Sequence, residues 1–291
     1  MSRRGRAGGA PRGRVAEGDS ESTGGGTGGP VFAEVDRDLA RARVLELAAT
    51  DERVVAGAVV GSLAGGGGDR WSDLDLTFAV ADAVPVFDVL EAWTGRLTAE
   101  LDAVHLFDLP SGPSIYRVFL LPSCLQLDIS FTPAAEFRAR GPRFELLFGV
   151  AGSPRPAPPP AAQDLFGHAV HHALRARLCL ERGRVWQAEH WIRSLWDSAL
   201  ALACRRRGLP AHHGRGLDAL PADILAAFRG ARVASFERAE MLRALAAALD
   251  ALQRETGEVR ELAARVEPTL RELAAEWPPA DGAAASGRSD G

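Results

Sequence analysis

The sequence predicts an α+β domain followed by an α-helical bundle domain. Three observations carry this prediction. Short apolar runs, separated by turns rich in glycine or proline, fill residues 53–131 in the pattern of β-strands. A proline-rich segment, residues 152–163, then interrupts the chain, and neither a helix nor a central strand accepts so many prolines. Beyond it, apolar residues recur at helical spacing toward Trp277.

This pattern divides the chain into five parts. Residues 1–30 are rich in Gly, Ser and Arg and have almost no large apolar side chains, so we expect a disordered arm. The small, polar residues 278–291 are expected to form a disordered tail for the same reason. Between them we expect a first domain over residues 31–151, a linker over residues 152–163 and a helical domain over residues 164–277.

The first domain is expected to mix helices and strands. We predict helices over residues 31–50 and Pro85 to Leu101, and strands in "RVVAGAVVGS", "DLDLTFAV", "AVHLFDL", "IYRVFLL" and "LQLDISF". In the first helix, Val35, Leu39, Ala42 and Leu45 have helical spacing and are expected to form its apolar face. The last strand alternates: Leu125, Leu127, Ile129 and Phe131 face one side, and Gln126, Asp128 and Ser130 face the other.

The second domain is expected to be all helical. Helices are predicted from Leu165 to Arg182, from Val185 to Arg207 and from Pro221 to Phe228. A longer helix from Phe236 toward Trp277 is expected to be interrupted near Gly257 and Pro268.

Composition excludes several classes of protein. The chain has 291 residues, of which 46% are hydrophobic, enough for a core without disulfide or metal support. Its three widely separated cysteines, Cys124, Cys179 and Cys204, fit neither a disulfide framework nor a zinc site. The sequence contains no lysine, which excludes a lysine nucleophile and a P-loop lysine.

Charge and hydropathy bear on partners and location. The formal net charge of −4 gives no electrostatic reason to coat nucleic acid. No apolar run approaches the about 20 residues of a membrane span, and the N-terminus lacks the apolar core of a signal peptide. We therefore expect a cytoplasmic protein without a membrane or nucleic-acid partner, and either a monomer or a homodimer.

The stretch "VGSLAGGGGDRWSDLDL" concentrates the residues suited to catalysis. Asp73 and Asp75 project from the same side of a strand, and adjacent carboxylates repel each other unless water or a divalent cation separates them. Asp128, on the polar side of a later strand, is the natural third ligand. Gly61 allows close backbone approach to a phosphate, Ser62 offers a hydroxyl, and we expect a helix N-terminus here to present amides to an anion.

These residues resemble the nucleotidyltransferases of the DNA polymerase beta superfamily. Their signature is Gly-Ser, a spacer, Asp-x-Asp and a third Asp on a later strand. Gly61, Ser62, Asp73, Asp75 and Asp128 match it in order, spacing and expected secondary structure. The resemblance covers about residues 32–135.

The resemblance implies a mixed sheet flanked by helices, two Mg²⁺ ions held by Asp73, Asp75 and Asp128, and ATP or another nucleoside triphosphate gripped at the Gly-Ser turn. It also implies transfer of a nucleotidyl group to a hydroxyl. Many members carry a basic residue in the spacer where this chain has Gly65, and we expect Arg70 to supply that charge.

The two-domain layout resembles the antibiotic nucleotidyltransferases that modify aminoglycosides or lincosamides. This predicts transfer of AMP from ATP to a small hydroxyl compound, such as an antibiotic, with the helical domain closing the site into a pocket. The alternative is a nucleotide-binding regulatory or antitoxin-like protein that partners or nucleotidylates a HEPN-type ribonuclease. Arg207 and His212 have the Arg-x4-His spacing of such ribonucleases, although a helix-ending loop explains that segment more simply.

Two further groups of polar residues lie on the predicted helices. His168, His171 and His172 have a spacing that can bind a transition metal, but no second ligand group accompanies them, which favours an ordinary helix surface. Glu189, His190, Arg193 and Asp197 recur at helical intervals, typical of a solvated face. If this helix closes over the site, one of them is a candidate general base.

Overall fold

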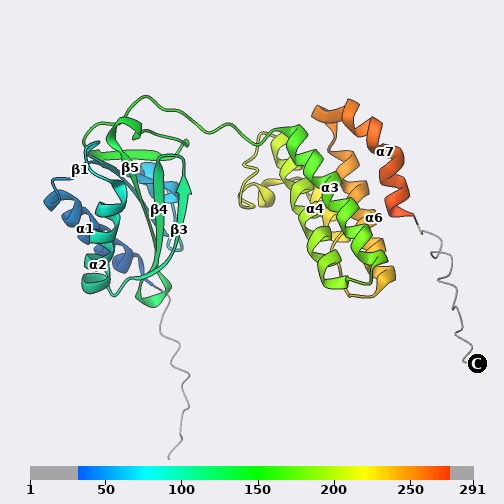
Figure 1. The fold of residues 1–291 in the computed structure, drawn as a ribbon, viewed down its shortest axis with the longest axis horizontal. Helices are drawn as coiled ribbons and strands as arrows, with labels where there is room; N and C mark the ends of the chain where they lie inside the picture. Colours follow the sequence, from blue (N-terminus) through cyan, green and yellow to red (C-terminus); the bar gives the residue numbers. More distant parts are fainter. Residues whose placement is uncertain (1–31, 276–291) are drawn as a thin grey trace, which may run out of the picture. The chain divides into compact units, whose positions relative to one another are not determined.

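A computed structural model describes residues 32–275 (Figure 1). The predicted disordered arm, residues 1–30, and tail, residues 278–291, lie outside the described residues, as does Trp277. The chain divides into two compact units, with the boundary between Pro156 and Ala157. This boundary falls inside the segment predicted as the linker.

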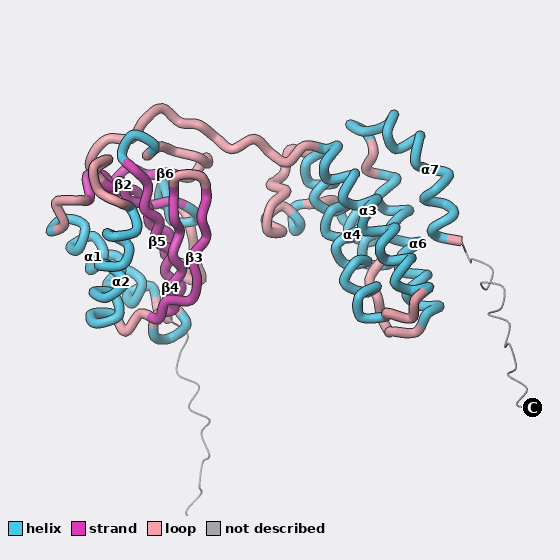
Figure 2. Tube along the Cα trace, viewed as in Figure 1, coloured by secondary structure: helices cyan, strands magenta, loops and turns pink. Residues whose placement is uncertain are grey.

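The first unit is a six-stranded mixed sheet with two helices on one face (Figures 1 and 2). The strands are β1 (Val54–Val60), β2 (Leu74–Val80), β3 (Val104–Ser111), β4 (Ser114–Leu120), β5 (Gln126–Pro133) and β6 (Phe144–Phe148), and the helices are α1 (Glu34–Thr50) and α2 (Val86–Leu101). The strand order is β3-β4-β5-β2-β1-β6. Strands β2 and β5 are parallel, and the other neighbouring pairs are antiparallel.

The helix-covered face of the sheet holds the main apolar core of this unit. Trp93 of α2 packs against Phe78 of β2 and Phe131 of β5, with ring centroids 5.1 and 5.0 Å away. Its indole Nε1 donates a hydrogen bond to Asp51 Oδ2 at 2.8 Å, so the buried ring keeps a polar partner. Because side chains alternate along a strand, this packing fixes which residues of β2 and β5 face away from the helices.

The opposite face of the central strands is polar and rich in small side chains. Thr77 of β2 accepts a hydrogen bond from Ser130 of β5 at 2.8 Å, and the hydroxyls of Ser114 and Thr132 lie 2.7 Å apart. All four residues are buried, so each hydroxyl is satisfied by its neighbour. The acidic residues of the sequence motif belong to this face.

Helix α1 forms where the sequence predicts a helix, but of the predicted apolar face only Leu45 packs against the core. Val35 and Leu39 are exposed, whereas Ala40, Val44 and Leu47 are buried. The buried face also includes Arg37, whose guanidinium donates to the backbone oxygens of Asp69 and Ser72 at 2.8 and 3.0 Å. Because a charged residue lies on the buried side of α1, the positions of the apolar residues alone do not identify that side.

The second unit is helical, with α3 (Ala162–Glu181), α4 (Val185–Arg206), α5 (Ala222–Gly230), α6 (Arg238–Arg254) and α7 (Arg260–Ala274). Helix α3 begins at Ala162, so the last residues assigned to the linker are helical. The expected break near Gly257 is present between α6 and α7. The break expected at Pro268 is not: α7 continues through it, with Ala263 and Leu270 on either side packed in the same core.

Within residues 32–275, no helix combines the length and the apolar character that crossing a bilayer demands.

Candidate metal and nucleotide site

Three carboxylates meet on the polar face of the sheet. Asp75 of β2 lies opposite Asp128 of β5 in the parallel register, and Asp73 precedes β2 by one residue. One carboxylate oxygen from each residue lies within 4.8 Å of the others, and all three residues are half-buried. In the described part of the chain, this is the one group of three or more Asp, Glu, His or Cys residues whose ligand atoms lie so close.

The electrostatics of this group favour a cation. Burial raises the pKa of Asp128, and the negative charge of Asp73 raises it further. Gln126 opposes this by donating from Nε2 to Asp128 Oδ1 at 3.0 Å, which lowers the pKa. Three clustered carboxylates supply the hard oxygen ligands that Mg²⁺ prefers, and a bound cation would relieve their mutual repulsion. The residues present therefore fit a magnesium site.

The Gly-Ser turn lies directly beside the carboxylates. Gly61 follows β1 with a φ of +72°, a conformation that favours glycine. A Cβ atom at this position would collide with the Asp75 carboxylate. Glycine is therefore required here both by the backbone conformation and by the close approach of Asp75.

Ser62 is the second residue of the turn. Its Oγ atom is buried and has no hydrogen-bond partner within the described residues. A buried hydroxyl without a partner is costly, and in a native structure it commonly marks a place where a ligand or water binds. Ser62 is thus a candidate ligand for an anionic group next to the carboxylates.

The helix expected at this turn is not present. The segment Gly61–Gly66 forms only a short 3-10 element, in which Ala64 and Gly65 have non-helical backbone angles. The reason is the glycine run: Gly65, Gly66 and Gly68 all adopt positive φ. An anion here would be met by Ser62 and loop amides, not by a helix N-terminus.

Arg70, expected to supply a positive charge, is exposed, and its guanidinium lies 4.0 Å from the centroid of the Trp71 ring. Two residues outside the sequence motif also contact this loop. Arg37 binds the carbonyls of Asp69 and Ser72, just before Asp73, and Glu145 of β6 accepts a hydrogen bond from the Gly65 amide at 2.8 Å. Both contacts join residues far apart in the sequence, so no local pattern signals them.

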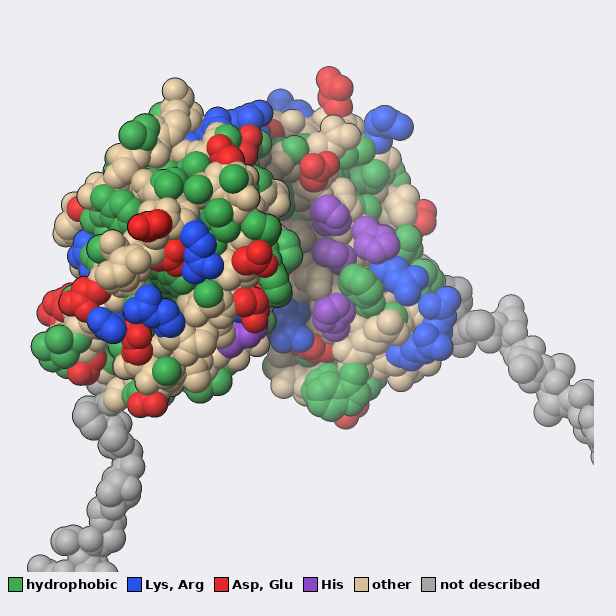
Figure 3. All heavy atoms as spheres, turned by 60° about the vertical axis from the view of Figure 1, so that its left-hand side comes forward, with side chains coloured by type: hydrophobic (Ala, Val, Ile, Leu, Met, Phe, Trp, Pro, Cys, Tyr) green, Lys and Arg blue, Asp and Glu red, His purple; other side chains and the backbone are tan. Residues whose placement is uncertain are grey.

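Three histidines of the helical unit lie around Trp191. The rings of His171 and His172 of α3 and of His190 of α4 have centroids 5.9, 5.4 and 5.0 Å from that of Trp191. Burial lowers the pKa of His172, and the neighbouring histidines lower it further. Figure 3 shows histidine side chains gathered on the surface of this unit. Within residues 32–275, they do not form a group with three close ligand atoms.

The residues with ribonuclease-like spacing are engaged elsewhere. Arg207 donates from Nη1 to Glu255 Oε2 at 2.7 Å and to the Ala203 carbonyl at 2.8 Å. Glu255 is buried, so this ion pair is part of the packing of the helical unit. His212 is exposed and its ring centroid lies 6.2 Å from that of His213. The geometry favours the helix-ending loop over a ribonuclease site.

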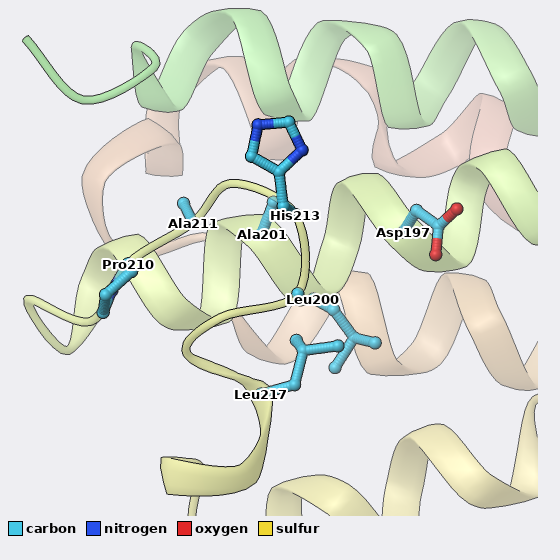
Figure 4. Close-up of a pocket in the computed structure, with 8 residues that line it drawn as sticks. Asp197, Leu200, Ala201, Pro210, Ala211, His213 and Leu217 are labelled. Atoms are coloured by element: carbon cyan, nitrogen blue, oxygen red, sulfur yellow. The ribbon is translucent and has the colours of Figure 1, made fainter. Parts of the chain in front are cut away.

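A pocket of about 350 Å³ lies beside this loop (Figure 4). It is lined by Asp197, Leu200, Ala201, Pro210, Ala211, His213, Gly214 and Leu217. These residues come from α4, from the loop that follows it and from a short 3-10 helix that begins at Leu217, so the pocket belongs wholly to the helical unit.

Comparisons with known proteins find a similarity only to solved structures, and only at a coarse level. No protein-family model matches the chain. No curated protein matches it by sequence. Among solved structures, an aminoglycoside 6-adenyltransferase from Bacillus subtilis is similar over 80% of this chain and 96% of its own, with a TM-score of 0.34 and 11% identity. A likeness of this degree is too coarse to assign an activity or a substrate.

The architecture is a mixed α+β unit, with helices flanking a six-stranded mixed sheet, followed by a helical region.

Proposed function

We propose that this chain is a Mg²⁺-dependent nucleotidyltransferase that moves a nucleotidyl group, AMP from ATP, to a hydroxyl of a small molecule. The observation that carries the proposal is the meeting of Asp73, Asp75 and Asp128 beside the Gly61–Ser62 turn, where the buried Ser62 hydroxyl has no partner among the described residues. Nucleotidyl transfer depends mainly on carboxylates that hold metal ions and on groups that bind the phosphates, and these residues could supply both.

Each residue of the site has a separate role in this proposal. Asp73 and Asp75 would hold two Mg²⁺ ions, and Asp128 would hold one of them. The ions supply charge neutralisation for the triphosphate when bound. Ser62 would donate a hydrogen bond to a β- or γ-phosphate oxygen, and Gly61 keeps the turn close to Asp75. Arg70 is proposed to add positive charge on the triphosphate side.

The reaction forms one bond and breaks one. The acceptor oxygen attacks the α-phosphorus of ATP as the bond to the pyrophosphate oxygen breaks, and pyrophosphate leaves. Asp128 is proposed to accept the hydroxyl proton and release it to solvent. Positioning and charge neutralisation dominate such transfers, so the site needs no covalent intermediate.

Labelled ATP tests this proposal. The full chain is incubated with Mg²⁺, a panel of small hydroxyl compounds and ATP labelled at the α-phosphate or, separately, at the γ-phosphate. The proposal predicts that α-label enters a small molecule and that γ-label leaves as pyrophosphate. Mass spectrometry should show an increment of one AMP on the acceptor. If the α-label appears only on a protein or on RNA, the regulatory, antitoxin-like function is favoured instead.

A further inference from the structure

The register of the sheet extends the carboxylate group into a row across four strands. Asp75 of β2 pairs with Asp128 of β5, Asp128 with Val118 of β4, and Val118 with Phe107 of β3. Partners in register project from the same face of a sheet. The face that holds the carboxylates therefore continues, strand by strand, toward Phe107.

This continuation is apolar. Leu120 pairs with Gln126 and Val104, and Leu109 pairs with Tyr116, so these leucines and Val104 lie on the same face as Phe107. The four residues Val104, Phe107, Leu109 and Leu120, here called the apolar strip, are 58%, 48%, 54% and 40% exposed. A contiguous apolar patch on a protein surface is typical of an interaction or ligand-binding site.

The charged residues of the same two strands lie on the other face. Arg117 of β4 pairs with Asp108 of β3, their side chains lying 2.6 Å apart, and Arg117 also bonds to Glu91 of α2. These charges neutralise one another against the helix. No member of the apolar strip is charged, so it offers no counter-charge to a cationic ligand.

The other flank of the carboxylates has the opposite character. Strand β1 adjoins β2 on the side away from β5, and it leads into Gly61 and Ser62, whose hydroxyl has no partner in residues 32–275. In nucleotidyl transfer the attacking and leaving oxygens lie roughly in line across the phosphorus. If the triphosphate occupies the Ser62 flank, the acceptor approaches from the flank of β5, β4 and β3.

We infer that the acceptor is an uncharged molecule with an apolar body that lies on the apolar strip and presents a hydroxyl to the carboxylates. The inference rests on the proposed function. It excludes polycationic acceptors as the preferred substrates, because ammonium groups that lie on the apolar strip would lose water without gaining a charged partner there. Apolar area removed from water supplies the binding energy instead.

The wild-type chain provides the first test. With labelled ATP and Mg²⁺, transfer rates are compared between neutral apolar compounds that carry a hydroxyl and polycationic aminoglycosides of similar size. The inference predicts a kcat/KM about tenfold or more higher for the neutral compounds. Faster transfer to the aminoglycosides would overturn the inference and leave the proposed function standing. No Mg²⁺-dependent nucleotide turnover with any acceptor would overturn the proposed function itself.

Variants provide the second test. Phe107→Thr and Leu109→Thr remove apolar area but keep strand-forming side chains, and each is expected to lower kcat/KM for the apolar acceptor about tenfold. The KM for ATP should not change. Leu39→Gln, at an exposed leucine on α1, is the matched control and should leave both values unchanged.

Two outcomes of the variant experiment count against the strip as an acceptor site. A wild-type dimer in sedimentation that becomes monomeric in Phe107→Thr would make the strip an interface between copies of this chain. A large fall in melting temperature of both threonine variants, with unchanged kcat/KM, would make it a packing surface.

Discussion

Asp75 of β2 stands directly opposite Asp128 of β5 in the parallel pair of strands at the centre of the sheet. Neighbouring strands are about 4.8 Å apart, so two carboxylates in register lie close together, and a cation between them would relieve their repulsion. We interpret it as an arrangement kept for metal binding.

Ser62→Ala should separate function from stability. Because the Ser62 hydroxyl is buried without a partner in the described chain, its removal should leave the melting temperature unchanged or slightly higher. If the hydroxyl binds a phosphate, the KM for ATP should rise about tenfold or more.

Ser114→Ala is the matched control for that variant. The Ser114 hydroxyl is also buried on the polar face, but it is bonded to Thr132. Its loss should lower the melting temperature and leave the KM for ATP unchanged. Equal changes in melting temperature and in the KM for ATP in both serine variants would contradict the assignment of Ser62 to the nucleotide site.

Gly61→Ala should damage the metal site through the backbone. The left-handed conformation costs an alanine about 1 kcal/mol, and the added Cβ atom must displace the Asp75 carboxylate. We expect weaker Mg²⁺ binding, measured by calorimetry, together with a lower melting temperature.

Gly65→Ala separates the cost of the backbone conformation from the effect of the clash with Asp75. Gly65 has nearly the same φ, +71°, but a Cβ atom there meets nothing within 4 Å. This variant should show the backbone cost alone and bind Mg²⁺ normally. Equal loss of Mg²⁺ affinity in both variants would contradict the role assigned to Gly61.

The sequence predicts the fold class because hydrophobic alternation and helical periodicity are local signals. The helix at residues 34–50 and the strands around Asp73, Asp75 and Asp128 follow from such signals. Strand β6 was not predicted, because the short segment Phe144–Phe148 shows no clear alternation and gains its pairing from β1.

Long-range contacts explain most of what the sequence could not show. The side of α1 that is buried depends on Arg37 reaching the backbone before Asp73, a contact across 35 positions. The register that aligns Asp75 with Asp128 follows from parallel pairing of two distant strands. The spacing in the sequence was enough to select Asp73, Asp75 and Asp128 as candidate metal ligands. The apolar residues in line with them can be identified only from the register of the strands.

Stability should fall at acidic pH through Asp51. Hydrogen bonds from Arg53 and Trp93 hold the pKa of its carboxyl at about 2, below the usual 3.8. A lowered pKa in the folded state contributes stability that is present above the unfolded-state value and is lost as pH falls through the folded-state value. We expect the loss between about pH 4 and pH 2, on the order of 1–2 kcal/mol.

Urea unfolding at a series of pH values, followed by circular dichroism, measures this effect. Asp51→Asn should be less stable at neutral pH and should show a flatter dependence over the same interval. An identical pH profile for the variant and the wild type would show that other groups control acid stability.

Arg177→Met should destabilise the helical unit. The Arg177 side chain is fully buried, bonds to Glu181 and donates to the carbonyls of Leu273 and Ala275 at the end of α7. Methionine fills similar space but leaves these acceptors without their donor. The loss in unfolding free energy should be about 2–4 kcal/mol by denaturation followed by circular dichroism. Arg193→Met, which removes an exposed ion pair with Glu189, should cost less than about 0.5 kcal/mol.

The most direct test of the metal and nucleotide site is calorimetric titration of the full chain with ATP, with and without Mg²⁺, for the wild type and Asp75→Asn. The account predicts Mg²⁺-dependent ATP binding by the wild type and its loss in the variant, because the variant lacks one carboxylate ligand of the metal site. Asp108→Asn, at a carboxylate on the opposite face, should bind Mg²⁺ and ATP like the wild type. Equal Mg²⁺-dependent ATP binding by the wild type and Asp75→Asn would contradict the account.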